Sequence, residues 1–163
     1  MIIFEDTRNQ IRVDKKTGRI HDKHKNIHDY CKSNGIEIIR TKLYCGDYTL
    51  ATNQSICIDT KKDMVELSQN LFQDHKRFTA ELKRAADAGI KLIILIEDNS
   101  IRNTTDLINW TNPQPNANKM TPNGARAFKV MSALNSKYGV EFKFCSRKET
   151  GEKIMELLTD GNG

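Results

Sequence analysis

Long hydrophobic runs and Cys-x-x-Cys pairs are missing from this chain of 163 residues. The longest unbroken apolar run, Leu92–Ile96, is far shorter than the ~20 residues that a membrane-spanning helix needs. The apolar start, Met1–Phe4, stops at Glu5 and does not resemble a signal peptide. These absences predict an intracellular protein with no membrane partner.

Cysteine and proline are both scarce. The four cysteines lie mostly beside apolar runs, which predicts buried thiols in a reducing compartment. All three prolines fall among asparagines within 112–123, which predicts a long polar loop there. With no internal repeat to suggest otherwise, we expect one domain over 1–159 and a frayed tail at 160–163.

Positive charge is in modest excess. The formal net charge is +5 and the pI is near 9.0, which is compatible with a polyanionic partner. Because the chain also carries 21 acidic residues, the excess of positive charge can bind such a partner only if it is concentrated in one part of the surface. Charge alone therefore permits a nucleic-acid partner without requiring one.

Hydrophobic periodicity predicts an α/β fold with a mixed central sheet flanked by helices. A small hairpin or a loop is expected over 11–20, and the segments 36–43, 48–51 and 56–60 are expected to form a β-meander. The apolar run 91–96 predicts a central strand covered on both faces. Other elements are a strand at 2–4, helices at 23–34, 63–71 and 78–88, and a final helix, strand and helix at 124–138, 140–145 and 149–158.

The most informative pattern is Asp47 followed by Asp59-Thr60-Lys61. If residues 56–61 form a strand, alternation places Asp59 and Lys61 on one face and Thr60 on the other. Two carboxylates and the Thr60 carbonyl would suit Mg²⁺ or Mn²⁺, which take oxygen ligands and keep several waters. The pattern therefore suggests a metal centre that hydrolyses phosphodiesters.

The spacing leaves alternatives open. In a chain with 29% charged residues, such carboxylates can simply be solvated at turns. Lys61 could act as an ammonium that orients water and stabilises negative charge, or as a base with a strongly lowered pKa. Metal-assisted chemistry also does not by itself separate DNA from RNA.

Several separated motifs together resemble the nuclease domain of XPF-type structure-specific endonucleases, in the PD-(D/E)xK superfamily. They are Ile2–Arg8, Gly46-Asp47-Tyr48, Ile58–Lys61 with Asp63, Arg77-Phe78 with Glu81-Leu82, and Leu92–Glu97. They span 2–98 in the family's order, and the helix-strand-helix extension at 122–159 follows the polar loop. The resemblance implies a restriction-endonuclease-like fold and a Mg²⁺- or Mn²⁺-dependent DNA endonuclease that acts on branched or flapped DNA in recombination, repair or replication.

Site residues carry over position by position. The resemblance implies catalytic roles for Asp47, Asp59, Lys61 and Asp6, and metal binding by Asp47, Asp59 and Thr60. It implies a supporting role for Glu81 and contacts to nucleic acid from Arg8, Arg77, Lys62 and Lys76. Asp6 and Arg8 could instead form an ion pair that caps the first strand.

Three departures from the family pattern matter. Asp59-Thr60-Lys61 stands where the family has Glu-Arg-Lys, and Asn9 stands at a glutamate position. No tandem helix-hairpin-helix region follows the nuclease motifs, which leaves DNA binding and dimerisation to this domain or to another protein. We therefore expect a stand-alone phage or bacterial version in the cytoplasm, with a homodimer left open. The alternative is a non-catalytic DNA-binding or partner-binding module on a decayed nuclease fold.

A histidine and lysine cluster follows the first strand. His21, His24 and His28 have helical spacing, but their charged neighbours favour a solvated face over a zinc site. Together with Lys15, Lys16 and Arg19, these histidines are hypothesised to contact the DNA backbone.

Overall fold

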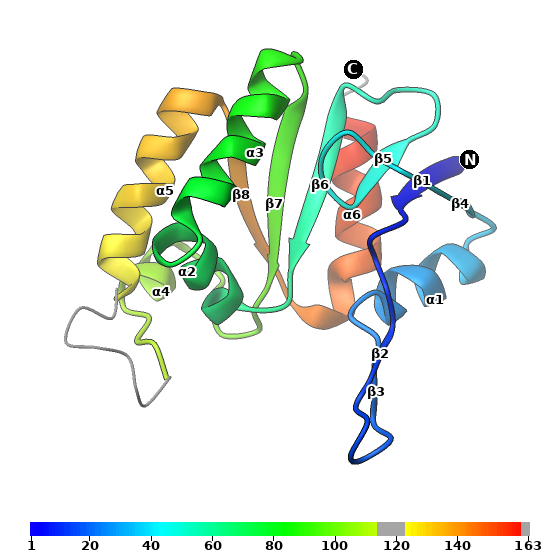
Figure 1. The fold of residues 1–163 in the computed structure, drawn as a ribbon, viewed down its shortest axis with the longest axis horizontal. Coiled ribbons are helices and arrows are strands. Elements are labelled where there is room, and N and C mark those ends of the chain that lie inside the picture. The colour runs from blue at the N-terminus through cyan, green and yellow to red at the C-terminus, as the bar shows by residue number, and fades with distance from the viewer. Residues whose placement is uncertain (114–122, 161–163) are drawn as a thin grey trace.

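The computed structural model describes residues 1–113 and 123–160. A six-stranded sheet in the order β4-β1-β5-β6-β7-β8 runs through the molecule, with helices on both faces (Figure 1). Neighbouring strands are parallel except at β1–β5 and β5–β6. The strands are β1 (Ile2–Asp6), β4 (Glu37–Thr41), β5 (Tyr48–Leu50), β6 (Ile56–Lys61), β7 (Lys91–Glu97) and β8 (Glu141–Cys145). The expected mixed sheet in a single domain is confirmed.

The helices divide between the two faces of the sheet. Helices α1 (Lys25–Ser33) and α6 (Thr150–Thr159) cover one face. The other face is covered by α2 (Met64–Phe72), α3 (His75–Asp87), α4 (Thr104–Ile108) and α5 (Gly124–Tyr138). The chain also forms a 3₁₀ turn, η1 (Arg147–Glu149), and a separate hairpin of β2 (Arg12–Val13) and β3 (Ile20–His21). Sequence periodicity missed α4 and η1, which are too short to show a repeat.

Strand β6 is buried along its whole length and separates the two cores. Ile56 and Ile58 pack with α1 and α6, whereas Cys57 packs with the helices of the other face. Because side chains alternate along a strand, Asp59 and Lys61 point to the same side as Cys57. Helix α2 then begins where expected, since the Asp63 side chain accepts a hydrogen bond from the Glu66 amide.

The predicted β-meander is wrong. Strand β4 pairs in parallel with β1, so β1 lies between β4 and β5, and only β5 and β6 form a hairpin. The physical reason is the crossover: α1 connects β1 to β4 across one face of the sheet, and such a connection brings parallel strands together. As a result, the ends of β1 and β6 and the residue before β5 meet on one side.

The predicted solvated face of histidines is wrong for His24 and His28, whereas His21 is exposed. Buried Glu5 accepts a hydrogen bond from the Tyr48 hydroxyl at 3.2 Å and lies 2.9 Å from His28 Nε2. The Tyr48 hydroxyl also lies 2.5 Å from His24 Nδ1, and burial lowers the pKa of His24 to about 4. His24 and His28 therefore tie α1 to β1 and β5.

Two predicted segments fall partly outside the described residues: 114–122 of the polar loop and 161–163 of the tail. Of the helices within 1–113 and 123–160, none is long and apolar enough to cross a membrane.

Candidate active site

A cleft of about 470 Å³ lies between α3 and the end of β6. Three carboxylates line it, Asp47, Asp59 and Glu81. Five cationic side chains line it as well, namely Arg8, Lys23, Lys61, Arg77 and Arg84. The excess of cations suits an anionic ligand such as a phosphate backbone.

Asp59 and Lys61 form a buried ion pair inside this cleft. Lys61 Nζ lies 2.9 Å from Asp59 Oδ2, as strand alternation predicts, and 5.8 Å from the centre of the Phe78 ring. Burial by itself lowers the pKa of Lys61. The charge of Asp59 and its hydrogen bond, together with the charges of Glu66 and Asp47, outweigh burial, and the pKa is raised. Burial, assisted by the charge of Asp47, raises the pKa of Asp59. Lys61 is therefore an ammonium, and the carboxylate beside it is costly to keep charged without more cations.

A tight turn places Asp47 beside β6. Gly46 has φ of 71°, and a Cβ there would lie 2.9 Å from the Ile58 carbonyl oxygen, so only glycine fits. The Asp47 amide donates to that same carbonyl at 2.7 Å. Asp47 Oδ2 accepts two hydrogen bonds from Thr60, one from the amide at 2.9 Å and one from the hydroxyl at 2.6 Å. Within the described residues no hydrogen bond reaches Oδ1, which leaves this oxygen available to a ligand.

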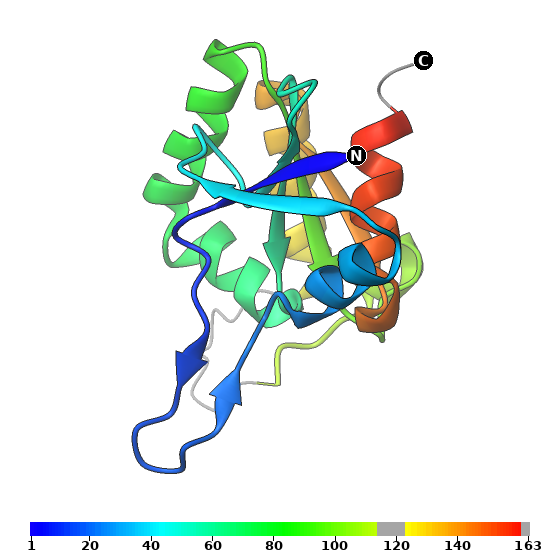
Figure 2. The same ribbon diagram turned by 90° about the vertical axis from the view of Figure 1, so that its right-hand side faces the viewer.

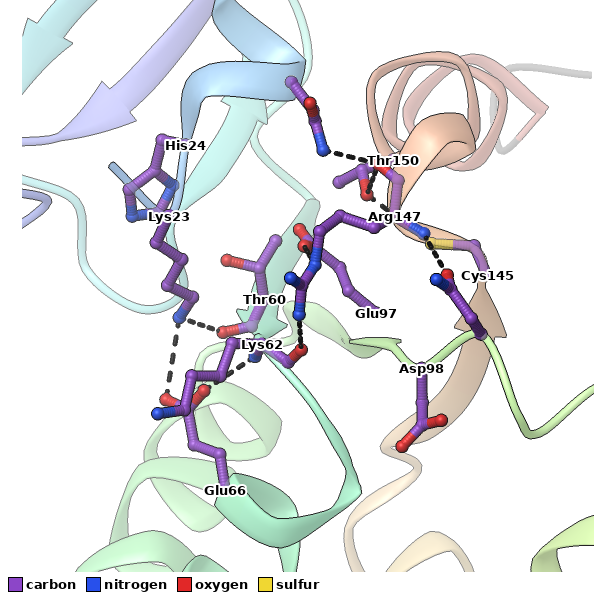
Figure 3. A network of polar contacts seen from close by, with 12 residues as sticks. Lys23, His24, Thr60, Lys62, Glu66, Glu97, Asp98, Cys145, Arg147 and Thr150 are labelled. Atoms are coloured by element: carbon purple, nitrogen blue, oxygen red, sulfur yellow. Dashed lines mark hydrogen bonds and ion pairs between the residues drawn. The ribbon is translucent and has the colours of Figure 1, made fainter. Parts of the chain in front are cut away.

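The Thr60 carbonyl also takes part in a polar contact, with Lys23. The Lys23 ammonium donates to the Thr60 carbonyl at 2.5 Å and lies 3.6 Å from Glu66 Oε1 (Figure 3). A metal ion at this carbonyl would therefore have to share the oxygen with Lys23 or displace it.

Asp6 is tied to Arg8 beside the cleft. Its carboxylate accepts from Arg8 Nε at 2.6 Å, from Arg8 Nη2 at 3.1 Å and from the Leu43 amide at 2.8 Å. These contacts lower the pKa of Asp6 against the opposing effect of burial. In this geometry Asp6 holds Arg8 at the rim of the cleft, which is the ion pair that the sequence left as an alternative.

The remaining predicted residues fall into two groups. Arg77 and Glu81 line the cleft from α3, and Glu81 accepts a hydrogen bond from the Gly46 amide at 3.4 Å. Lys62 and Lys76 are not among the lining residues. The Lys62 backbone instead contacts Glu66 and Arg147, on the side shown in Figure 3.

The structure adds lining residues that sequence reasoning missed. Asn9 Nδ2 and Asn70 Oδ1 are buried without a hydrogen-bond partner, and both residues line the cleft. Buried polar atoms without partners are uncommon, so these amides are candidates for contacts with a bound ligand. The position of Asn9 had been noted only as a departure from the family, and neither Asn70 nor Arg84 belongs to a local motif.

A polar network behind the site holds Lys23 in place. Glu97, at the end of β7, is buried, and burial raises its pKa to about 7. Lys23 and the Arg147 guanidinium, 3.9 Å from Glu97, partly oppose this shift. Glu66 contacts both Lys23 and the Lys62 amide, so the network joins the end of β6 to α2 and η1 (Figure 3).

The donor set fits a hard divalent cation. In the part of the chain that the structure describes, no group of three or more His, Cys, Asp or Glu side chains could hold a metal. Mg²⁺ does not need such a group, because it retains waters and often binds one or two carboxylates plus substrate phosphates. Asp47 and Asp59 line the same cleft, and each has one oxygen outside the contacts described above.

Comparisons with known proteins bear on the family and the fold of this chain. The model of a family described as the ERCC4 domain matches residues 13–157, which takes the match beyond the polar loop to α6. No curated protein matches this sequence.

Solved structures show the same fold. The chain resembles XPF from Aeropyrum pernix at 18% identity with a TM-score of 0.65, covering 99% of this chain and 65% of that one. It also resembles XPF from Aeropyrum pernix in complex with DNA, at 18% identity with a TM-score of 0.60, covering 99% and 64%. The chain thus spans about 65% of the length of that protein, and the expected nuclease-type fold is confirmed.

Proposed function

Because this chain belongs to the ERCC4 domain family, we propose that it is a metal-dependent DNA endonuclease that cuts branched or flapped DNA. One observation carries the proposal. Asp47 and Asp59 come from different segments, yet they line one cleft together with the Lys61 ammonium and four other cations. A solvated pair of surface carboxylates would not need the double hydrogen bond from Thr60 or the buried partner at Lys61.

The carboxylates have a defined part in this proposal. Asp47 Oδ1 and the second oxygen of Asp59 would hold Mg²⁺ or Mn²⁺. When bound, such a cation neutralises charge on the scissile phosphate and acidifies a water molecule. Thr60 keeps the Asp47 carboxylate in a single orientation through its two hydrogen bonds.

Lys61 acts in its protonated form. Its raised pKa favours the ammonium over a neutral base in this geometry, so we assign it to donate to a phosphate oxygen or to orient the attacking water. Phe78 covers one side of Lys61 and reduces the competing access of bulk water.

The cationic rim binds the nucleic-acid backbone. Arg8 and Arg77 are exposed at the cleft and suit phosphate oxygens, because a guanidinium keeps its charge and offers several donors. Lys62 and Lys76 are assigned contacts further along the same strand, outside the cleft. A homodimer and a phage or bacterial cytoplasmic setting remain predictions of the family resemblance.

A cleavage assay tests the proposal directly. Labelled branched, flapped and linear DNA are incubated with Mg²⁺, with Mn²⁺ and with EDTA, using wild type, Asp47→Asn and Lys61→Ala. Asp87→Asn is the matched control, because Asp87 lies exposed at the end of α3 and, within residues 1–113 and 123–160, forms an ion pair only with Lys83. We expect metal-dependent cutting by wild type and the control and a loss of ~100-fold or more in the two site variants.

Other outcomes would overturn parts of the proposal. Undiminished cutting by Asp47→Asn and Lys61→Ala would reject the site. Absence of cutting together with absence of saturable Mn²⁺ binding in calorimetry would favour a non-catalytic module on the same fold. Faster cutting of an RNA version of the substrate would reject DNA as the substrate.

A further inference from the structure

The β2–β3 hairpin projects from the body of the protein (Figures 1 and 2). We call residues 11–22 the arm. Asn9, two residues before the arm, and Lys23, directly after it, both line the cleft. Whatever occupies the cleft therefore lies next to the base of the arm.

The arm is an ordered ribbon with a built turn. Asp14 Oδ1 accepts hydrogen bonds from the amides of Lys16 at 2.8 Å and Thr17 at 2.9 Å. Gly18 has φ of 67° and donates to the Asp14 carbonyl at 2.8 Å. The charge of Asp14 thus stabilises the turn, as its lowered pKa also indicates.

The pairing register gives the arm two different faces. Arg12 pairs with His21 and Val13 pairs with Ile20, so Val13 and Ile20 point to the same side. Arg12 and His21 share the other side. The Asp14 amide donates to the Arg19 carbonyl at 2.8 Å and continues the pairing, which puts Asp14 and Arg19 on that side as well. Ile11 directly precedes the paired residues. Ile11, Val13 and Ile20 are 57%, 57% and 66% exposed, respectively. One face of the arm is therefore apolar and uncovered, and the other is basic.

An isolated two-stranded ribbon is only marginally stable in water, and an exposed apolar face adds a cost. The arm carries four cations, Arg12, Lys15, Lys16 and Arg19, against two carboxylates. This charge continues the cationic lining of the cleft. A polyanion that fills the cleft and passes over the arm would match the charge of both surfaces. An acidic face on a partner protein would not explain why the arm begins and ends at the cleft.

From this geometry we propose that the arm binds the DNA next to the cleft and recognises the branch point, an inference that rests on the proposed function. The basic face contacts phosphates of the flanking duplex. The apolar face packs on base surfaces that are unstacked at a branch, much as apolar side chains wedge between base steps in bent DNA. Linear duplex offers no such surface without distortion, so the apolar face confers preference for branched DNA.

The two faces are tested separately by binding, without any cleavage. Fluorescence anisotropy is measured in EDTA and in Ca²⁺ on branched and linear DNA of equal length and charge. The apolar variant is Ile11→Ser/Val13→Ser/Ile20→Ser and the basic variant is Arg12→Ala/Arg19→Ala. Controls are Ile108→Ser, an exposed isoleucine on α4, and Lys153→Ala on α6. Thermal unfolding verifies that each variant is folded, which is expected because the altered side chains are exposed.

The apolar variant is expected to weaken binding to branched DNA by about tenfold and to linear DNA by less than about twofold. The basic variant is expected to weaken both similarly and to lower the slope of log K against log salt by about 1 to 2. Neither control should change either quantity.

Equal loss on both DNAs in the apolar variant, or no loss, would overturn the assignment of branch recognition. If wild type is a dimer, the apolar variant is a monomer and both prefer branched DNA equally, a second copy of the chain covers the arm instead. Because the readout is binding, wild type that binds branched DNA tightly but does not cut it would reject the endonuclease while leaving the arm proposal standing.

Discussion

Thr60 donates two hydrogen bonds to one carboxylate oxygen of Asp47, from its amide at 2.9 Å and from its hydroxyl at 2.6 Å. Thr60, which stands where the family has an arginine, thus contacts a proposed metal ligand directly. Its neutral hydroxyl orients Asp47, and the Lys23 ammonium at the Thr60 carbonyl supplies a cation nearby.

Replacing the Thr60 hydroxyl by a methyl group should impair the proposed reaction more than the fold. Thr60→Val keeps the shape and the amide bond to Asp47 but removes the hydroxyl bond, a change of about 1–2 kcal/mol. We expect kcat for DNA cleavage to fall ~10-fold, because Asp47 loses part of its orientation. Thr60→Ser keeps the hydroxyl and should retain near-normal kcat. Equal kcat for the Val and Ser variants would contradict the orienting role.

Breaking the buried ion pair should be costly. Lys61→Met leaves Asp59 buried beside Asp47 without its ion-pair partner, and removal of one partner of a buried pair typically costs about 3–5 kcal/mol. The double variant Asp59→Asn/Lys61→Met should recover much of this loss, because the uncompensated charge is gone. Urea unfolding at pH 7 in EDTA measures the free energy of unfolding of wild type and of both variants. A double variant no more stable than Lys61→Met would show that lost packing dominates instead.

The turn at Gly46 should not tolerate a side chain. Gly46→Ala places a Cβ 2.9 Å from the Ile58 carbonyl oxygen in a backbone with φ of 71°. Gly35→Ala is the matched control, since Gly35 has φ of 65° but nothing within 4 Å of the added Cβ. The conformational strain of about 1–2 kcal/mol is common to both, so any further loss in Gly46→Ala reports the clash. Equal melting temperatures for the two variants would reject the close approach.

The buried Glu97 carboxyl should make stability depend on pH. Burial raises its folded-state pKa from the ordinary 4.5 to about 7. A hydrogen bond with Thr150 and the charges of Lys23 and Arg147 oppose the shift, and the charge of Glu66 adds to it. The folded state therefore binds a proton at Glu97 more tightly than the unfolded state does. The stability that this protonation contributes is fully present below about pH 4.5 and is lost as pH rises through about 7.

Glu97→Gln measures that contribution. One pKa unit corresponds to about 1.4 kcal/mol, so wild type should lose up to about 3 kcal/mol relative to Glu97→Gln between pH 5 and pH 8. Chemical denaturation at a series of pH values gives the difference. Parallel stability curves for the two proteins would show that Glu97 is ionised at a normal pKa.

Local patterns in the sequence predicted much of what surrounds the site. Strand alternation placed Asp59 and Lys61 on one side of β6, and Asp63 was recognised as the cap of α2. The apolar run of β7 was recognised as a strand covered on both faces. Each of these features depends on residues close together in the chain, whose backbone geometry has a fixed period or a specific cap.

The errors came from contacts between distant residues. The β-meander failed because β1 is inserted between β4 and β5, and strand order depends on how helix α1 crosses the sheet. His24 was expected in solvent, but it packs against Tyr48 from a strand that follows it by 24 residues.

Local patterns in the chain were enough to predict the candidate site residues, namely the two carboxylates and the lysine two positions after the second, and the strand that carries Asp59 and Lys61. The folded structure was needed to show that Thr60 orients Asp47 and that Lys23 reaches the Thr60 carbonyl from 37 residues away. It was also needed to show that the arm begins and ends at the cleft. The difference has a physical cause. Periodicity and caps act between neighbours in the chain, whereas these contacts exist only once the sheet and its crossover have brought distant segments together.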